Sequence, residues 1–295
     1  MMLRRLFVTM SIALCVCGCN PVQAAETPDS APVFVTATAE TPETAKTEEN
    51  TKEESKNKET EQEKEIMKYD LDTMFSKEQK KELEKYFSQF LDSVKEDGTA
   101  EVFIPSGSGL TAKDLVQYMT AYDFGEVYRN TTYKNLKGST GTKLKGSVNP
   151  ELKKQNDLVK QYIVSETEGM GPTLENAKLL YEKIVNGFTY EMNDTWGVNV
   201  LLETGKGKCC DFAILYNAML KEIGIEGYCA AGTNTNPDGS VVSHMWNVFV
   251  LDDSVYTVDI TSGMSHKEYG LDMWEGFKKT DSCVLNDTYK LENLI

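Results

Sequence analysis

The sequence predicts an α+β fold in which a helix packs on an antiparallel sheet. Apolar residues recur at intervals of three and four from Cys209 onward, and Gly224 marks the end of this predicted helix. Two apolar runs follow at 241–250 and 255–260, and the short turn between them predicts a β-hairpin. Residues 69–165 add a small region of mixed helices and strands before this core.

The composition describes an acidic chain with a sizeable apolar content. The chain has 295 residues, enough for one large domain or two modest ones, and 40% of them are apolar. Its 46 acidic and 31 basic residues give a net charge of −15, which argues against nucleic acid as a partner because Lys and Arg bind phosphate. The four cysteines after residue 19 form no CxxC pair and no EF-hand loop is present, so we expect no metal and no cofactor. Imidazole chemistry must use His244 or His266, the two histidines.

Residues 1–19 have the layout of a bacterial lipoprotein signal peptide. Two arginines precede an apolar run from Leu6 to Val16, which is too short to span a membrane. The end of the run, Val16-Cys17-Gly18-Cys19, resembles a lipobox, in which the last cysteine is lipidated and becomes the mature N-terminus. We therefore expect an exported protein, anchored through lipid on Cys19 to the outer face of a bacterial cell membrane. An ordinary cleaved signal peptide is the alternative.

Residues 20–68 have the composition of an acidic tether. They contain 12 acidic residues, 6 basic residues and a single aromatic residue, Phe34. Such a segment buries too little apolar surface to offset its ordering entropy, so we expect it to be disordered. Repulsion among its charges would hold the folded domain away from the membrane.

Local patterns predict the elements of residues 69–165, the expected N-terminal region. Three helices are expected to open at the capping box Ser76-Lys77-Glu78-Gln79, at Thr111 and at Asn149-Pro150. Strands are expected over Ala100–Ile104 and Glu126–Asn135, with Gly98 ending the first helix and a loop over 137–148. No group of chemically active residues occurs here, so we expect this region to pack and to shape the substrate site.

The expected catalytic domain, residues 166–295, begins with an amphipathic helix over 173–185 and reaches Cys209 through the turn 205–208. A helix N-terminus presents unpaired N–H groups and a positive potential, which favour a thiolate and can bind a developing oxyanion through the Cys209 N–H. The spacing places Cys209 on the core-facing stripe, with Cys210 rotated by about 100° from it. Cys209 is therefore a candidate nucleophile, and a small buried hydrophobic residue is the alternative interpretation.

The predicted hairpin brings an imidazole and a carboxylate onto one face of the sheet. If Leu251 pairs with Ser254, then His244 and Asp259 are diagonal neighbours, about 7–8 Å apart at the backbone. A register shift of one residue would place them on opposite faces. An acid beside an imidazole can fix its tautomer and stabilise its cation, so that the imidazole can deprotonate a thiol. A core histidine without a catalytic role is the alternative.

Three motifs in this order resemble the transglutaminase-like superfamily: Gly207–Ala213 (GKCCDFA), His244–Asn247 (HMWN) and Val258–Thr261 (VDIT). The resemblance covers about residues 173–265 and implies a papain-like core, with the cysteine helix on an antiparallel sheet that carries His and Asp. It assigns Cys209 as the nucleophile, His244 as the general base and acid, and Asp259 as the group that orients the imidazole. Two departures are Ile260, where many members have Pro, and the doubled Cys209-Cys210.

The resemblance implies acyl transfer at amide bonds through a thioester. Capture of the thioester by water makes a peptidase or amidase, capture by a protein amine makes a crosslinking transglutaminase, and the sequence leaves both open. The expected substrate is a protein or peptide, including cell-wall peptide. Tyr190, Trp196 and Trp246 are candidates for lining the cleft, and each is equally plausible as a core residue.

Two other classes of protein stay open. A surface binding or scaffold lipoprotein would keep the triad without turnover. A cell-wall cysteine hydrolase of the NlpC type would use a second histidine as the orienting group, but His266 lies in a polar segment and Asp259 fits that role better. Among Cys210, Cys229 and Cys283, at most one intramolecular disulfide can form.

Overall fold

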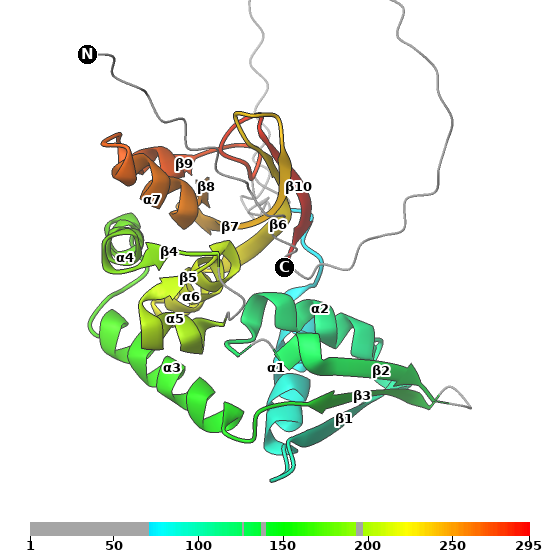
Figure 1. Ribbon diagram of the computed structural model, residues 1–295. Helices are drawn as coiled ribbons and strands as arrows, with labels where there is room; N and C mark the ends of the chain where they lie inside the picture. The colour runs from blue at the N-terminus through cyan, green and yellow to red at the C-terminus, as the bar shows by residue number, and fades with distance from the viewer. Residues whose placement is uncertain (1–70, 126, 137–139, 193–196) are drawn as a thin grey trace, which may run out of the picture. The chain divides into compact units, whose positions relative to one another are not determined.

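The computed structural model describes residues 71–295 except 126, 137–139 and 193–196 (Figure 1). The expected signal peptide, the acidic tether, Cys19 and Trp196 lie outside the described residues. The described residues belong to one compact unit. Within the described ranges, no helix is long and apolar enough to cross a bilayer.

The N-terminal elements form a three-stranded antiparallel sheet in the order β1-β3-β2, against which helices pack. These elements are α1 (Lys77–Asp92), β1 (Thr99–Pro105), η1 (Ser106–Ser108), α2 (Ala112–Tyr122), η2 (Val127–Asn130), β2 (Thr131–Asn135) and β3 (Gly141–Ser147). The predicted capping box at Ser76 is confirmed, and Thr111 caps α2 in the same way. Alternate side chains of β1 are buried, which gives this small sheet one apolar face toward the helices.

Three expectations for this region are wrong. Gly141–Ser147, expected within a loop, is the central strand β3, whose buried Leu144 faces inward between two lysines that face outward. Helix α1 ends at Asp92 instead of reaching Gly98, because the Ser93 hydroxyl bonds the Phe90 carbonyl and closes the last turn. The expected strand Glu126–Asn135 starts only at Thr131, since a 3₁₀ turn occupies the residues before it.

The C-terminal part contains a five-stranded antiparallel sheet in the order β10-β6-β7-β8-β9 and a central helix, α6, against which the sheet and other helices pack (Figure 1). The helices are α3 (Leu152–Thr167), α4 (Leu174–Gly187), α5 (Val198–Thr204), α6 (Cys209–Glu222), α7 (Ile260–Glu268) and η3 (Met273–Gly276). The strands are β4 (Thr189–Tyr190), β5 (Lys206–Gly207), β6 (Gly227–Thr235), β7 (Val241–Leu251), β8 (Ser254–Val258), β9 (Phe277–Lys279) and β10 (Tyr289–Leu294). The fold is therefore α+β, as the sequence predicts.

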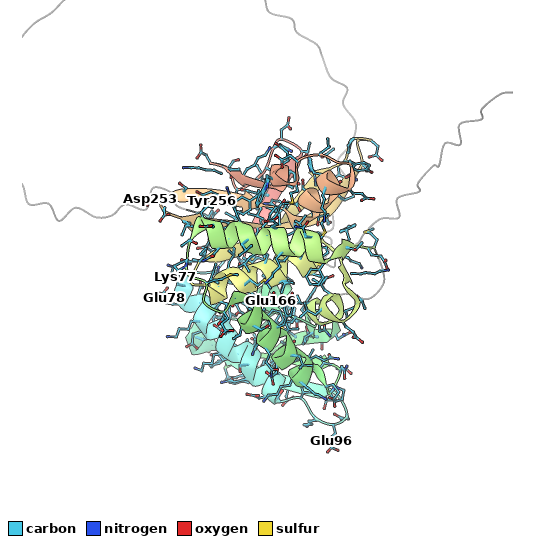
Figure 2. All side chains as sticks on the ribbon, turned by 90° about the vertical axis from the view of Figure 1, so that its left-hand side faces the viewer. Lys77, Glu78, Glu96, Glu166, Asp253 and Tyr256 are labelled. Atoms are coloured by element: carbon cyan, nitrogen blue, oxygen red, sulfur yellow. The ribbon has the colours of Figure 1, made fainter. Side chains whose placement is uncertain are left out.

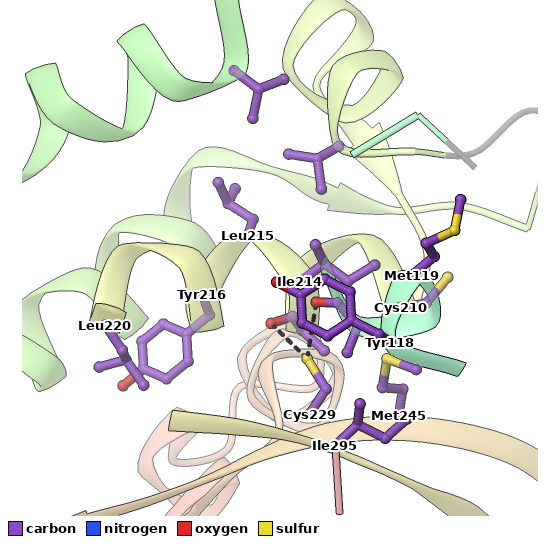
Figure 3. Close-up of a cluster of buried hydrophobic side chains, with 14 of the residues drawn as sticks. Tyr118, Met119, Cys210, Ile214, Leu215, Tyr216, Leu220, Cys229, Met245 and Ile295 are labelled. Atoms are coloured by element: carbon purple, nitrogen blue, oxygen red, sulfur yellow. Dashed lines mark hydrogen bonds between the residues drawn. The ribbon is translucent and has the colours of Figure 1, made fainter. Parts of the chain in front are cut away.

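The five-stranded sheet has an apolar cluster on each face. Met245 and Phe249 of β7 belong to the main core around α6, whereas Trp246 and Val248 belong to a second, smaller cluster. Cys229 of β6 lies under α6, and its thiol donates to the Ala213 carbonyl at 3.7 Å (Figure 3). Burial raises the pKa of Cys229 to about 12, so this thiol is a structural and chemically inert group.

The predicted hairpin is confirmed in its register, with Leu251 opposite Ser254. Asp252 and Asp253 make the turn with φ angles of 48° and 53°, the left-handed conformation that a two-residue hairpin turn requires. Figure 2 labels Asp253 of this turn and Tyr256 of the strand that follows it. The second strand ends at Val258 and not at residue 260, because Asp259 caps helix α7 by accepting from the Ser262 N–H at 3.1 Å.

Candidate active site

A buried carboxylate fixes the backbone that leads into α6. Asp211 accepts from the Lys208 N–H at 2.9 Å and from the Gly197 N–H at 2.8 Å. Burial raises the pKa of Asp211, although these two backbone donors favour the ionised form. A Cβ at Gly207 would lie 2.9 Å from the Leu201 side chain and 3.2 Å from Asp211 Oδ2, so a larger residue here would displace Leu201 and crowd Asp211. Sequence analysis missed Asp211, although its place three residues after the helix cap is a recognisable signal.

The two adjacent cysteines at the start of α6 have different surroundings. Cys209 is 4% exposed and Cys210 is 7% exposed, so both side chains are buried. Cys210 belongs to the main apolar core, where Figure 3 shows it beside Met119 and Met245. Cys209 instead hydrogen-bonds the His244 side chain. Cys209 is buried, as expected, but the expectation that Cys210 is rotated away from the core is wrong, because α6 is buried nearly all round and its core includes Cys210.

His244 and Asp259 meet as the hairpin register predicts. His244 Nε2 lies 2.7 Å from Asp259 Oδ2, and the two side chains are 9% and 2% exposed. Regular pairing of β7 with β8 stops at Asn247 and Val258, one residue pair before His244 and Asp259 come close. The Asp259 N–H donates instead to the Gly276 carbonyl. Since His244 Nε2 hydrogen-bonds Asp259, the other ring nitrogen, Nδ1, is the atom of His244 that can hydrogen-bond Cys209.

Charge and hydrogen bonding outweigh burial at this pair. Burial by itself lowers the pKa of His244, but the charge and hydrogen bond of Asp259, with a contribution from Cys209, raise it well above the usual value of 6.5. Burial by itself raises the pKa of Asp259, but the same pairing and the bonds from Tyr289 and Ser262 lower it below 3.8. The favoured state is an imidazolium beside a carboxylate, which also favours a thiolate at Cys209.

Tyr289 completes this group, and sequence analysis missed it. The Tyr289 hydroxyl donates to Asp259 Oδ2 at 2.6 Å, the same oxygen that contacts His244. Its ring also packs edge-on against His244, with 5.9 Å between the ring centroids. Residue 289 stands 30 positions after Asp259 in an edge strand, and no local pattern in the sequence indicates this contact.

Trp246 does not line a cleft. It is 1% exposed, and its Nε1–H donates to the Cys283 carbonyl at 2.8 Å. Its ring lies nearly parallel to the His244 ring, at 6.1 Å between centroids, so it supports the imidazole from within the second cluster. The next residue, Asn247, donates to the Ala213 carbonyl at 2.9 Å and ties β7 to α6.

An open groove of about 920 Å³ leads to His244 and Asp259. Helix α7 forms part of its wall, and Tyr190 of β4, which is 37% exposed, also lines it. His266 lies in the same groove on α7, where its Nδ1 bonds the Ser262 carbonyl at 2.8 Å. The polar segment around His266 is thus helical, a feature that sequence analysis missed. Of the three cleft candidates, the structure places Tyr190 on the groove wall and buries Trp246.

The described cysteines Cys209, Cys210, Cys229 and Cys283 form no disulfide with one another. Within the described ranges, no cluster of three or more His, Cys, Asp or Glu side chains could hold a metal ion.

The geometry is that of a mixed α+β domain with a buried cysteine, histidine and aspartate joined by hydrogen bonds. A family model of the transglutaminase-like superfamily matches residues 160–260, which contain all three residues. The chain thus carries a transglutaminase-like superfamily domain, as the three sequence motifs predict.

Several solved structures have limited similarity to the chain. A proposed protease of Parabacteroides distasonis has 13% identity and a TM-score of 0.26, over 43% of this chain and 33% of that one. A proposed cysteine protease from Cytophaga hutchinsonii has 10% identity and a TM-score of 0.31, over 68% and 78%. LapG of Legionella pneumophila has 16% identity and a TM-score of 0.31, over 47% and 80%.

The chain spans only a third of the Parabacteroides protein. A search among curated proteins finds no match.

Proposed function

We propose that the protein is a thiol-dependent acyl-transfer enzyme that acts on amide bonds of proteins or peptides, including cell-wall peptides. The observation that carries the proposal is the hydrogen-bonded series Cys209, His244 and Asp259, in which Cys209 is the first residue of the buried helix α6. The superfamily domain over residues 160–260 supports the same class of chemistry. The open groove of about 920 Å³ beside His244 has room for a peptide.

Each residue has one role in the proposed reaction. The Cys209 sulfur attacks the amide carbonyl carbon, and the helix N-terminus, including the Cys209 N–H, stabilises the negative charge on the oxygen. The His244 imidazolium gives its proton to the leaving nitrogen as the C–N bond breaks, which leaves a thioester on Cys209 and a free amine. His244 then takes a proton from water or from an acceptor amine, which attacks the thioester and releases the thiol. Asp259 holds the imidazole and stabilises its cation throughout.

Five variants test the proposed roles: Cys209→Ala, Cys210→Ala, His244→Ala, Asp259→Asn and His266→Ala. Cys209→Ala and His244→Ala are expected to abolish turnover, and Asp259→Asn to reduce it by orders of magnitude, as in serine proteases with the same substitution. Cys210→Ala and His266→Ala are the matched controls and should retain activity. Turnover is measured as cleavage of a mixed peptide library, with and without added amines to detect transamidation.

Alkylation by iodoacetamide gives an independent measurement on the same five proteins. Cys209 is expected to be the labelled thiol, and labelling near pH 7 should slow in His244→Ala because the thiol loses the group that ionises it. Thermal midpoints check that each variant folds. Preferential labelling of Cys210, or an essential His266, would contradict the assignment. A reactive Cys209 without any turnover would instead favour a binding or scaffold protein.

We also propose that the protein is exported and anchored by lipid on Cys19. The support is the sequence of residues 1–19, where an apolar run ends in Val16-Cys17-Gly18-Cys19. Cys19→Ala should remove the lipid mass and either release the protein from the membrane fraction or leave it unprocessed. Mass spectrometry of the wild-type N-terminus decides the matter: an unmodified N-terminus cleaved at another position would refute lipidation.

A further inference from the structure

The groove beside His244 is lined by two polar side chains whose shielded oxygens have no hydrogen-bond partner. Among the described residues, buried side-chain oxygens without a partner occur in Asn156, Asn199, Asn234, Asn247 and Thr261. Asn234 and Thr261 are the two of these that line the groove. A shielded polar atom without a partner costs about 1–3 kcal/mol, and folded proteins contain only a few of them.

The position of Asn234 relative to His244 follows from the strand register. Gly232 of β6 lies opposite His244 of β7, so Asn234, two residues further along β6, shares its face and is its diagonal neighbour. Diagonal neighbours are about 7–8 Å apart at the backbone. An extended peptide rises about 3.3 Å per residue, so this separation corresponds to about two residues of bound substrate.

The chemistry of the side chain selects the class of ligand. A carboxamide carries both an acceptor oxygen and a donor nitrogen, which match the N–H and C=O of a peptide unit. The carboxamide is neutral, and the charged side chains that line the groove offset one another, Lys267 against Glu268 and His244 against Asp259. A neutral, extended main chain therefore fits this part of the groove better than an anion or a cation.

We propose that Asn234 forms a subsite for a main-chain amide of the substrate, about two residues along from the peptide unit that lies beside His244. The inference rests on the proposed function and specifies its substrate as an extended peptide. A single glutamine side chain cannot occupy both positions, because the carboxamide at Cys209 ends there. Recognition thus depends on peptide length.

The test measures how well blocked peptides protect Cys209 from iodoacetamide. The probes are a mixture of N-acetylated, C-amidated pentapeptides of random sequence without cysteine, and a matched dipeptide mixture. In the wild type, pentapeptides should protect at lower concentration than dipeptides. In Asn234→Ala, the half-protecting pentapeptide concentration should rise about five-fold or more, the equivalent of one lost hydrogen bond. Dipeptides should protect both proteins equally poorly.

Asn199→Ala is the matched control, because Asn199 also has a shielded oxygen without a partner but does not line the groove. Its protection by pentapeptides should equal that of the wild type. The labelling rate without peptide should also be unchanged in Asn234→Ala, which shows that the reactive group is intact.

The two hypotheses fail in different ways. If Cys209 reacts no faster than an ordinary thiol, the proposed nucleophile is wrong, although peptide protection can still be measured. If labelling is normal but pentapeptides protect Asn234→Ala as well as the wild type, or protect no better than dipeptides, the subsite is refuted.

Discussion

At the residue scale, Asp259 Oδ2 hydrogen-bonds both His244 and Tyr289, and this shared acceptor affects the pKa of the His244 imidazole. Asp259 Oδ2 contacts His244 Nε2 at 2.7 Å and the Tyr289 hydroxyl at 2.6 Å. A donor that neutralises part of the carboxylate charge weakens its hold on the imidazolium proton. Tyr289 is therefore a positioning residue that acts on His244 through Asp259.

Tyr289→Phe should raise the pKa of His244 further, because the Asp259 charge then acts on the imidazole alone. The pH profile of Cys209 alkylation reports this change as its second inflection, where the imidazolium beside the thiolate loses its proton. We expect that inflection to move to higher pH in Tyr289→Phe while the fold is retained. Tyr269→Phe, which removes an exposed hydroxyl from the groove wall, is the control and should leave the profile unchanged. An inflection that stays in place would show that Tyr289 only fills space, and one that moves to lower pH would contradict the proposed effect of its hydroxyl on Asp259.

At the element scale, the sequence predicts best those elements whose signals are local. The capping boxes at Ser76 and Thr111, the start of α6 at Cys209 and the hairpin register all depend on residues within a few positions of each other. The register alone is enough to bring His244 and Asp259 together. The cysteine, histidine and aspartate of the candidate site are therefore accessible to sequence reasoning.

Elements that depend on contacts between residues far apart in the sequence are not predicted by such local signals. Strand β3 has one large apolar residue, Leu144, and exists because β1 and β2 pair with it on both sides. Helix α7 has few apolar residues, and its start depends on the Asp259 side chain. The contact of Tyr289 with Asp259 depends on the pairing of β10 with β6, which no local pattern encodes. The burial of Trp246 likewise depends on the segment around Cys283.

At the scale of the whole molecule, buried titratable groups determine how stability depends on pH. Asp123, at the end of α2, is fully buried, and burial raises its pKa to about 7, although backbone N–H groups of Gly125 and Tyr128 donate to it. Between pH 4 and 7 the folded state then binds a proton that the unfolded state has released, so stability falls as pH rises. The His244 contribution is complete below pH 6.5 and is also lost as pH rises through the raised pKa of the folded state. The Asp259 contribution behaves oppositely, because its lowered pKa removes stability only in acid.

The thermal midpoint of the wild type should therefore be lower at pH 8 than at pH 5.5, and the net charge of −15 acts in the same direction through self-repulsion. Asp123→Asn removes one of these contributions, since an amide does not titrate, and should reduce the fall between the two pH values. Each kcal/mol of lost stability corresponds to a shift of about 2–4 °C for a domain of this size. The measurement is the difference between two midpoints of the same protein, so a general destabilisation by the substitution does not affect it. An equal fall in the wild type and in Asp123→Asn would mean that Asp123 is ionised throughout this range, held by its backbone donors in spite of burial.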